Sequence, residues 1–124
     1  MRIGIVGGGQ LGQMLGEAGE ELGMQCTFVD PSEAPPAASA GDVVKAAFDN
    51  QAALEQLSAT CDVITYEFEN VPVDALDALD GSTPLYPPPK ALEKAQDRKL
   101  EKSLFVELGI PVPAHQAVDS LEQL

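Results

Sequence analysis

The chain has 124 residues, and its seven Lys and Arg residues against twenty Asp and Glu residues give a formal net charge of −13 at pH 7. This length suits one domain with its own core, or one domain and part of a second, whereas the negative charge repels the phosphates of nucleic acids and of anionic lipids. No run approaches the roughly eighteen apolar residues of a membrane span and no leader with a cleavage site precedes the first strand, so the sequence predicts a cytoplasmic protein that binds neither nucleic acid nor membrane.

The first thirty residues predict a strand, a glycine turn, a helix and a second strand. Residues 2–6 (RIGIV) are apolar and β-branched and run into glycines, as in a buried parallel strand. The helix ends at Gly23, and residues 25–29 (QCTFV) form the second strand after a right-handed crossover. The apolar residues of this helix recur at the spacing of a single stripe: Leu11, Leu15, Ala18 and Leu22.

Two more strand and helix pairs are expected before residue 88. Residues 30–41 are rich in proline and alanine without periodicity, which predicts a surface loop ahead of a short strand at 42–46. Asp49 or Asn50 can cap the next helix. The elements expected after it are a strand at 62–66 (DVITY), a helix from Pro72 to Leu79 and a last strand at 83–86.

A run of three prolines, residues 87–89, marks a boundary because proline cannot continue a central strand. We expect one domain at 1–88 and the beginning of a second at 89–124. The second part is predicted to contain a helix, a strand at 112–118 and a helix start at Asp119. Since that last helix barely begins, we expect the chain to be the front of a longer protein. The first helix after the prolines carries an apolar stripe: Leu100, Leu104, Phe105 and Leu108.

Few residues of the kinds that carry catalysis stand out. Cys26 and Cys61 each lie inside an apolar run, so we expect two buried free thiols and neither a disulfide nor a metal site. His115 has no nucleophile partner, and no serine lies in a nucleophile elbow. We therefore expect no catalytic residue and no metal ligand within this chain.

The turn from Val6 to Gly12 (VGGGQLG) fits the pattern G-x-G-x-x-G through Gly7, Gly9 and Gly12. Glycines let the backbone approach an anion, and the amides that begin the next helix attract a phosphate or a carboxylate. Asp30 ends the second strand, where dinucleotide folds place the carboxylate that bonds the ribose, although strands also end in Asp to start a turn. The pattern alone leaves open a dinucleotide site and a turn that binds nothing.

Glu67 and Glu69 follow the strand at 62–66. As alternate residues on one strand face at the carboxyl edge of the sheet, they are expected to point into the same crevice as the glycine loop. Carboxylates there suit hydrogen bonds to sugar hydroxyls or to an amine and repel a second phosphate, whereas the competing interpretation is a solvated acidic turn. The pattern does not decide which glutamate makes the contact.

Arg98 and Lys99 are two of the seven basic residues. A contact with a nucleotide phosphate is one interpretation, and a solvated helix face is the other.

Four stretches resemble, in the same order, the N5-carboxyaminoimidazole ribonucleotide synthase family, the ATPase subunits of phosphoribosylaminoimidazole carboxylase in the ATP-grasp superfamily. They are IGIVGGGQLGQML, DVITYEFENVP, YPPPKAL and QDRKLEKSLFVELGIPVP. A dehydrogenase would share only the first stretch. The resemblance implies an α/β fold, with a Rossmann-like preATP-grasp domain built on a parallel sheet and followed by the start of an ATP-grasp domain.

The resemblance also implies the site. In this family the glycine loop and the strand-end glutamate hold aminoimidazole ribonucleotide, and ATP lies between later domains. The positions implied here are Gly9, Gln10 and Leu11 at the ribonucleotide phosphate, Glu67 at its ribose or amine, and Arg98 as an early ATP contact. Gln10 favours this family over the related formate-dependent glycinamide ribonucleotide transformylase, which carries Glu at the matching position.

For the longer protein, the resemblance implies a ligase that uses ATP, Mg²⁺ and bicarbonate. ATP phosphorylates bicarbonate to carboxyphosphate, which carboxylates the exocyclic amine of the ribonucleotide. It also implies a cytoplasmic homodimer. This chain ends before the lysines, the lid and the metal-binding carboxylates of the ATP-grasp core, so we expect weak substrate binding, no tightly bound cofactor and no catalysis by it alone. Its apolar stripe at 100–108 is expected to be exposed and to favour dimerisation.

Two other interpretations compete with this one. A NAD-binding sensor module of Rossmann type rests on the glycine motif and Asp30, and it conflicts with Glu67 and Glu69, which a pyrophosphate would avoid. A pure interaction domain would bind no small molecule.

Overall fold

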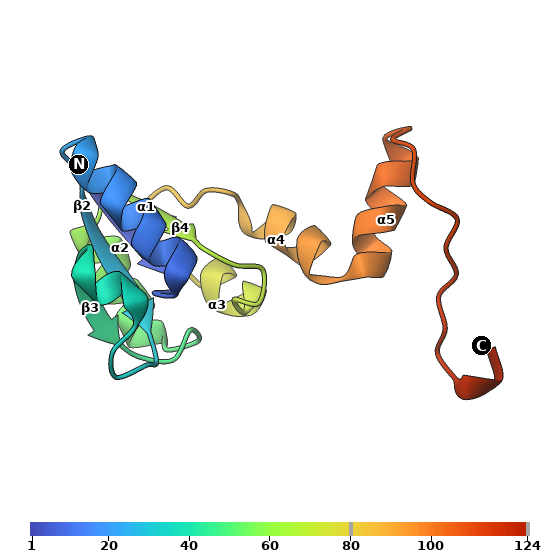
Figure 1. Cartoon of the computed structure of the whole chain (residues 1–124), viewed down its shortest axis with the longest axis horizontal. Helices are drawn as coiled ribbons and strands as arrows, with labels where there is room; N and C mark the ends of the chain where they lie inside the picture. The colour runs from blue at the N-terminus through green and yellow to red at the C-terminus, as the bar shows by residue number, and fades with distance from the viewer. Residues whose placement is uncertain (80, 124) are drawn as a thin grey trace.

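A computed structural model of the chain describes residues 1–79 and 81–123 (Figure 1). Parallel strands form one sheet in the order β3-β2-β1-β4. Their bounds are Arg2–Val6 for β1, Gln25–Asp30 for β2, Asp42–Lys45 for β3 and Val63–Tyr66 for β4. The α/β class, the parallel sheet and these four strands are as the sequence predicts.

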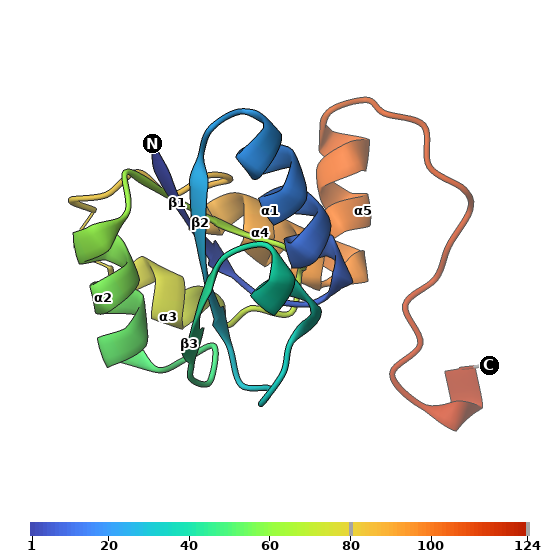
Figure 2. The same ribbon diagram turned by 60° about the vertical axis from the view of Figure 1, so that its left-hand side comes forward.

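Helices cover both faces of the sheet (Figures 1 and 2). In chain order the helices are α1 (Gln10–Glu21), the 3₁₀ helix η1 (Pro36–Ser39), α2 (Gln51–Thr60), α3 (Val73–Asp77), α4 (Pro89–Gln96), α5 (Arg98–Glu107) and the 3₁₀ helix η2 (Leu121–Gln123). Of these, α5 and η2 lie away from the sheet (Figure 1). The side chain of Asn50 caps α2 by accepting a hydrogen bond from the amide of Ala53 at 3.0 Å. Within residues 1–79 and 81–123, no helix has the length and apolar character needed to span a bilayer.

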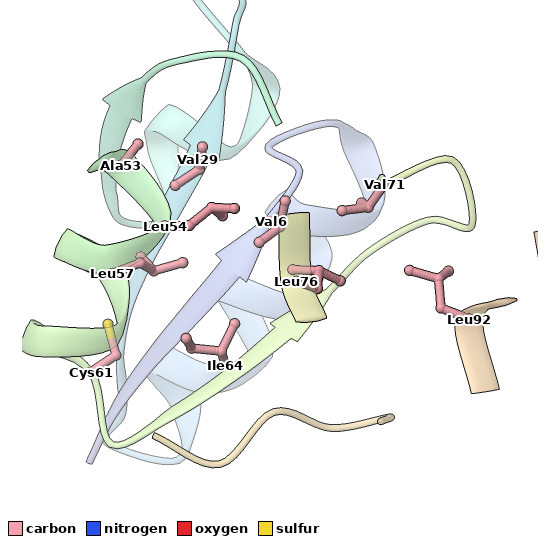
Figure 3. Close-up of a cluster of buried hydrophobic side chains, with 10 residues drawn as sticks. All are labelled: Val6, Val29, Ala53, Leu54, Leu57, Cys61, Ile64, Val71, Leu76 and Leu92. Carbon is pink, nitrogen blue, oxygen red and sulfur yellow. The ribbon is translucent and has the colours of Figure 1, made fainter. Parts of the chain in front are cut away.

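The hydrophobic core has two parts, one on each face of the sheet. The larger cluster packs α2 and α3 against the sheet (Figure 3). Its buried members are Val6, Val29, Ala53, Leu54, Leu57, Cys61, Ile64, Val71, Leu76 and Leu92. The smaller cluster, on the α1 side, contains Ile5, Cys26, Phe28 and Ala37. Cys26 and Cys61 are buried and free, as expected, and burial raises the pKa of both thiols.

Helix α1 packs on the sheet through glycines, and its apolar stripe faces outward. The buried residues of α1 are Gly12, Gly16 and Gly19, whereas Leu11, Leu15 and Leu22 are exposed. A Cβ on Gly16 would lie 2.8 Å from Cβ of Ala40 and 2.9 Å from Cζ of Phe28. An apolar stripe is typical of the face that meets the core, but here the glycines let the helix axis approach the sheet closely and so determine which face turns inward.

Three expectations about the later elements are wrong. Residues 83–86 form a single parallel bridge, between Leu85 and Ile64, and no full strand. Residues 112–118 form no strand, because they run away from the sheet and have no neighbour to pair with (Figure 1). The helix start at Asp119 becomes only the short 3₁₀ helix η2.

The segment after the prolines begins on the first core and then leaves it (Figure 1). Leu92 of α4 is buried in the larger cluster, whereas α5 buries none of its residues. Leu100 and Leu108 in the stripe of α5 are exposed, and Leu104 and Phe105 are half-buried. The domain boundary after residue 88 stays a prediction.

The glycine face of α1 gives a stability prediction. Replacing Gly16 by Ala should lower the free energy of unfolding by about 1–2 kcal/mol, because overpacking against Ala40 and Phe28 outweighs the better helix propensity of alanine. Urea unfolding followed by circular dichroism measures the change. The exposed Glu20 on the same helix supplies the matched control, since Glu20→Ala should be neutral or slightly stabilising. A Gly16→Ala variant more stable than the parent would contradict the close packing.

Candidate functional site

The carboxyl ends of β1, β2 and β4 lie together at one edge of the sheet. Val6 is in register with Val29 of β2 on one side and with Tyr66 of β4 on the other. The chain continues from β1 through β2 to β3 on one side and then returns to place β4 on the opposite side of β1. The gap between the ends of β1 and β4 is therefore a topological switch point, where open α/β sheets bind their ligands.

Glu67 lies at this switch point, with its carboxylate seated in the glycine loop. The amide of Gly9 donates a hydrogen bond to Oε1 at 2.8 Å, and the amide of Gly12 donates one to Oε2. The backbone amide of Glu67 donates to the carbonyl of Val6 at 3.1 Å, so the residue continues the pairing of β4 with β1. Both oxygens of this side chain are thus held by the loop.

The motif glycines make room for this carboxylate. A Cβ on Gly7 would lie 2.4 Å from Cγ of Glu67, and a Cβ on Gly9 or Gly12 would lie 2.8 Å from one of its oxygens. Gly7 also has φ +109°, a conformation that side chains rarely adopt. The pattern G-x-G-x-x-G therefore has an intramolecular cause in this chain, namely the close approach of Glu67.

Asp30 supports the other side of the loop. Its Oδ2 accepts from the amide of Gly8 at 2.9 Å and its Oδ1 from the amide of Ser32 at 2.8 Å, and only 6% of the residue is exposed. Burial by itself raises the pKa of this carboxyl, but the hydrogen bonds from Ser32 and Gly8 outweigh it and hold the pKa below its usual value. Asp30 is thus an ionised turn residue, with both oxygens engaged by the backbone.

The amides of Gln10 and Leu11 remain open to a ligand. Both residues are exposed in the first turn of α1, and across residues 1–79 and 81–123 neither amide donates a hydrogen bond. These two amides lie at the positive end of the dipole of α1, beside the carboxylate of Glu67. The site therefore combines two free donors with a fixed acceptor.

Glu69 does not share a strand face with Glu67, contrary to the expectation. β4 ends at Tyr66, and the backbone turns immediately after it. Glu69 is exposed, whereas Glu67 is half-buried. Both still line a groove of about 370 Å³ between the end of β4 and α4, whose other walls are Tyr66, Phe68, Pro87, Ala91, Leu92 and Ala95.

Arg98 lies on α5, outside the glycine-loop site. Its guanidinium forms an ion pair with Glu101 and is largely exposed. It lines a second groove, of about 340 Å³, with Lys99, Lys102 and His115. Lys102 is not among the site residues predicted from the sequence, although its spacing of four from Arg98 on one helix indicates it. His115 is given no role by the sequence, and only the path of the chain after α5 brings this residue here.

Comparisons with known proteins agree with this fold. A family model described as the ribonucleotide synthetase preATP-grasp domain matches residues 1–96. The N5-carboxyaminoimidazole ribonucleotide synthase of Pseudomonas aeruginosa is 44% identical over 124 residues, which are 100% of this chain and 34% of that protein. The crystal structure of the synthetase from Thermus thermophilus has 50% identity and a TM-score of 0.89, covering 97% of this chain and 33% of that one.

The Staphylococcus aureus synthetase, crystallised in complex with ADP, is 38% identical with a TM-score of 0.82, and the match covers 87% of this chain and 29% of that one. The chain thus spans about a third of the length of the relatives that it matches.

The state of Asp30 gives a pH prediction. Asp30→Asn should lower the free energy of unfolding at pH 7 by about 1–3 kcal/mol, because two backbone amides lose a charged acceptor. Since the folded pKa of Asp30 lies below its unfolded value, its contribution is complete above about pH 4 and is lost as the pH falls further. Urea titrations at neutral and acidic pH should therefore show a flatter acid dependence in the variant.

The exposed Asp49 provides the control for this experiment. Asp49→Asn removes the same charge without removing these hydrogen bonds, and it should keep the acid dependence of the parent. An Asp30→Asn variant whose stability falls with acid as steeply as that of the parent would contradict the assignment.

Proposed function

The chain belongs to the family of the ribonucleotide synthetase preATP-grasp domain, and we propose that it is the substrate-binding part of an N5-carboxyaminoimidazole ribonucleotide synthase. The names of its relatives in Pseudomonas aeruginosa and Thermus thermophilus support this proposal. The observation that carries it is the arrangement at the switch point, where two free amides begin a helix beside a fixed carboxylate.

Each part of a ribonucleotide has a matching group at this edge. The amides of Gln10 and Leu11, at the positive end of α1, suit the 5′-phosphate. The carboxylate oxygens of Glu67 keep lone pairs beyond those used by the loop, so they can also accept from a ribose hydroxyl or from the amine. Gly9 contributes by holding Glu67 in place, since its own amide is already engaged.

The groove beside Glu67 suits the aminoimidazole ring. Its walls include the rings of Tyr66 and Phe68 and the side chain of Leu92, so a flat heteroaromatic group would lie against apolar atoms. Phe68 is itself fixed by an edge-to-face contact with Phe48, with ring centroids 5.1 Å apart. Because Glu67 is anchored and half-buried while Glu69 is exposed, we assign the substrate contact to Glu67.

ATP is proposed to contact the groove on α5. Arg98, Lys99 and Lys102 supply three of the seven basic residues of the chain there, against the two carboxylates of Asp97 and Asp119, and the basic side chains suit a polyphosphate. The ADP bound to the Staphylococcus aureus relative supports nucleotide use in the family. The described residues contain no group of three side chains that could hold a metal ion, so we assign Mg²⁺ to the ATP phosphates within a longer protein.

The complete reaction is assigned to that longer protein. There, ATP would activate bicarbonate as carboxyphosphate, and the amine of the bound ribonucleotide would be carboxylated. In that protein, the role of this chain would be to bind and orient the ribonucleotide. The proposal includes a cytoplasmic homodimer for the longer protein and no catalysis by these residues alone.

The alternative of a NAD-binding module receives no support from the geometry. Asp30 is buried and bonded to Gly8 and Ser32, so its carboxylate does not face a ribose. The amides of Gly9 and Gly12, which would bind a pyrophosphate, already hold Glu67.

Nuclear magnetic resonance of the ¹⁵N-labelled chain tests the proposal. Adding aminoimidazole ribonucleotide should shift the amide signals of Gln10 and Leu11 more than any others, because these donors are free in the first turn of α1. NADH at the same concentration should leave them unchanged. Shifts caused by NADH alone, or none from the ribonucleotide at millimolar concentration, would overturn it.

A further inference from the structure

We propose that Glu67 is the built-in anion of the glycine loop and that it excludes dinucleotides and other diphosphates from this edge of the sheet. Its carboxylate occupies the position at which the equivalent turn of dinucleotide-binding folds receives a pyrophosphate. This role is independent of which small molecule the site finally takes.

Helix α1 lacks the usual local means of satisfying its first amides. Its N-cap is Gly9, which has no side chain to accept a hydrogen bond, and no acidic residue lies in its first turn. Glu67 supplies both the acceptor and the negative charge, from 58 residues away along the chain. The carboxylate therefore acts as the cap of α1, delivered by the end of β4.

The carboxylate of Glu67 fills the space between the three motif glycines. The Cβ positions of Gly7, Gly9 and Gly12 all fall within 2.8 Å of atoms of Glu67, so the side chain touches the backbone at each motif glycine. A phosphate bound to the amides of Gly9 and Gly12 would overlap with it. Binding a diphosphate would therefore require Glu67 to leave, which would also remove the cap from α1.

Electrostatic repulsion by Glu67 disfavours the same ligands that its bulk excludes from the loop. An anion that competed for the amides of Gly9 and Gly12 would be in direct contact with the carboxylate of Glu67 and repelled by it, and the chain as a whole carries a net charge of −13. The amides of Gln10 and Leu11 remain for one phosphate, whereas the loop itself accepts no further one. Glu67 thus favours ligands that place a hydroxyl or an amine beside it.

Anion rescue of a Glu67→Ala variant tests this role. Removing the side chain should empty the loop, lower the melting temperature and create a site for a small anion. Formate, phosphate or pyrophosphate should then raise the melting temperature of Glu67→Ala by about 4 °C or more over chloride of equal ionic strength. Each of these anions should raise the melting temperature of the parent less than that of Glu67→Ala, because only the amides of Gln10 and Leu11 are open to an anion in the parent.

Glu69→Ala is the matched control, because it removes the same charge two residues away from an exposed side chain. The comparison at equal ionic strength removes the general stabilisation that any salt gives to so acidic a chain. Equal responses of the parent, Glu69→Ala and Glu67→Ala would overturn the proposal. A rise in the melting temperature of the parent with pyrophosphate as large as that of Glu67→Ala would do so too.

A second variant covers the case in which Glu67→Ala does not fold. Glu67→Gln keeps the shape of the side chain but offers only one carbonyl oxygen to the two amides. Hydrogen exchange at Gly9 and Gly12, followed by nuclear magnetic resonance, should be faster than in a Glu69→Gln control. Unchanged exchange at both amides would contradict the capping role of Glu67.

Discussion

The carboxylate of Glu67, held by the amides of Gly9 and Gly12, joins the end of β4 to the turn between β1 and α1. This contact links residues more than fifty positions apart in the sequence, at the switch point of the sheet. Because it accepts from the amides of Gly9, the N-cap of α1, and of Gly12 in its first turn, it takes the place of an N-cap side chain. The arrangement of the candidate site depends on this one side chain.

The pattern G-x-G-x-x-G by itself suggests a phosphate-binding loop, but in this fold the glycines accommodate a carboxylate of the same chain. Glycines are required wherever a backbone must approach another group closely, and a phosphate is only one such group. In this chain, Gly7, Gly9 and Gly12 approach a carboxylate. The site consequently presents a fixed acceptor beside the free donors of Gln10 and Leu11, which suits a monophosphate that also carries hydroxyl and amine groups.

The two ends of the chain contribute to function in different ways. The sheet and the helices packed on it form the hydrophobic core that fixes the candidate site, whereas α5 buries none of its residues and exposes apolar and basic side chains. The relatives are about three times as long as this chain. In such a protein, ATP would bind between the groove of α5 and further domains. The proposal requires this, because it places the ribonucleotide at the sheet edge and ATP at α5.

The sequence by itself determined the parallel strands, because runs such as RIGIV and DVITY followed by turn residues favour one local structure strongly, and its family motifs indicated Gln10, Leu11 and Glu67. Only the tertiary structure decided which face of α1 turns inward, since glycines at 12, 16 and 19 permit a contact that an apolar stripe does not reveal. It also decided against strands at 83–86 and 112–118, because a strand needs a neighbour to pair with. The occupant of the glycine loop depended on a contact between residues far apart in the chain, and local patterns do not encode such contacts.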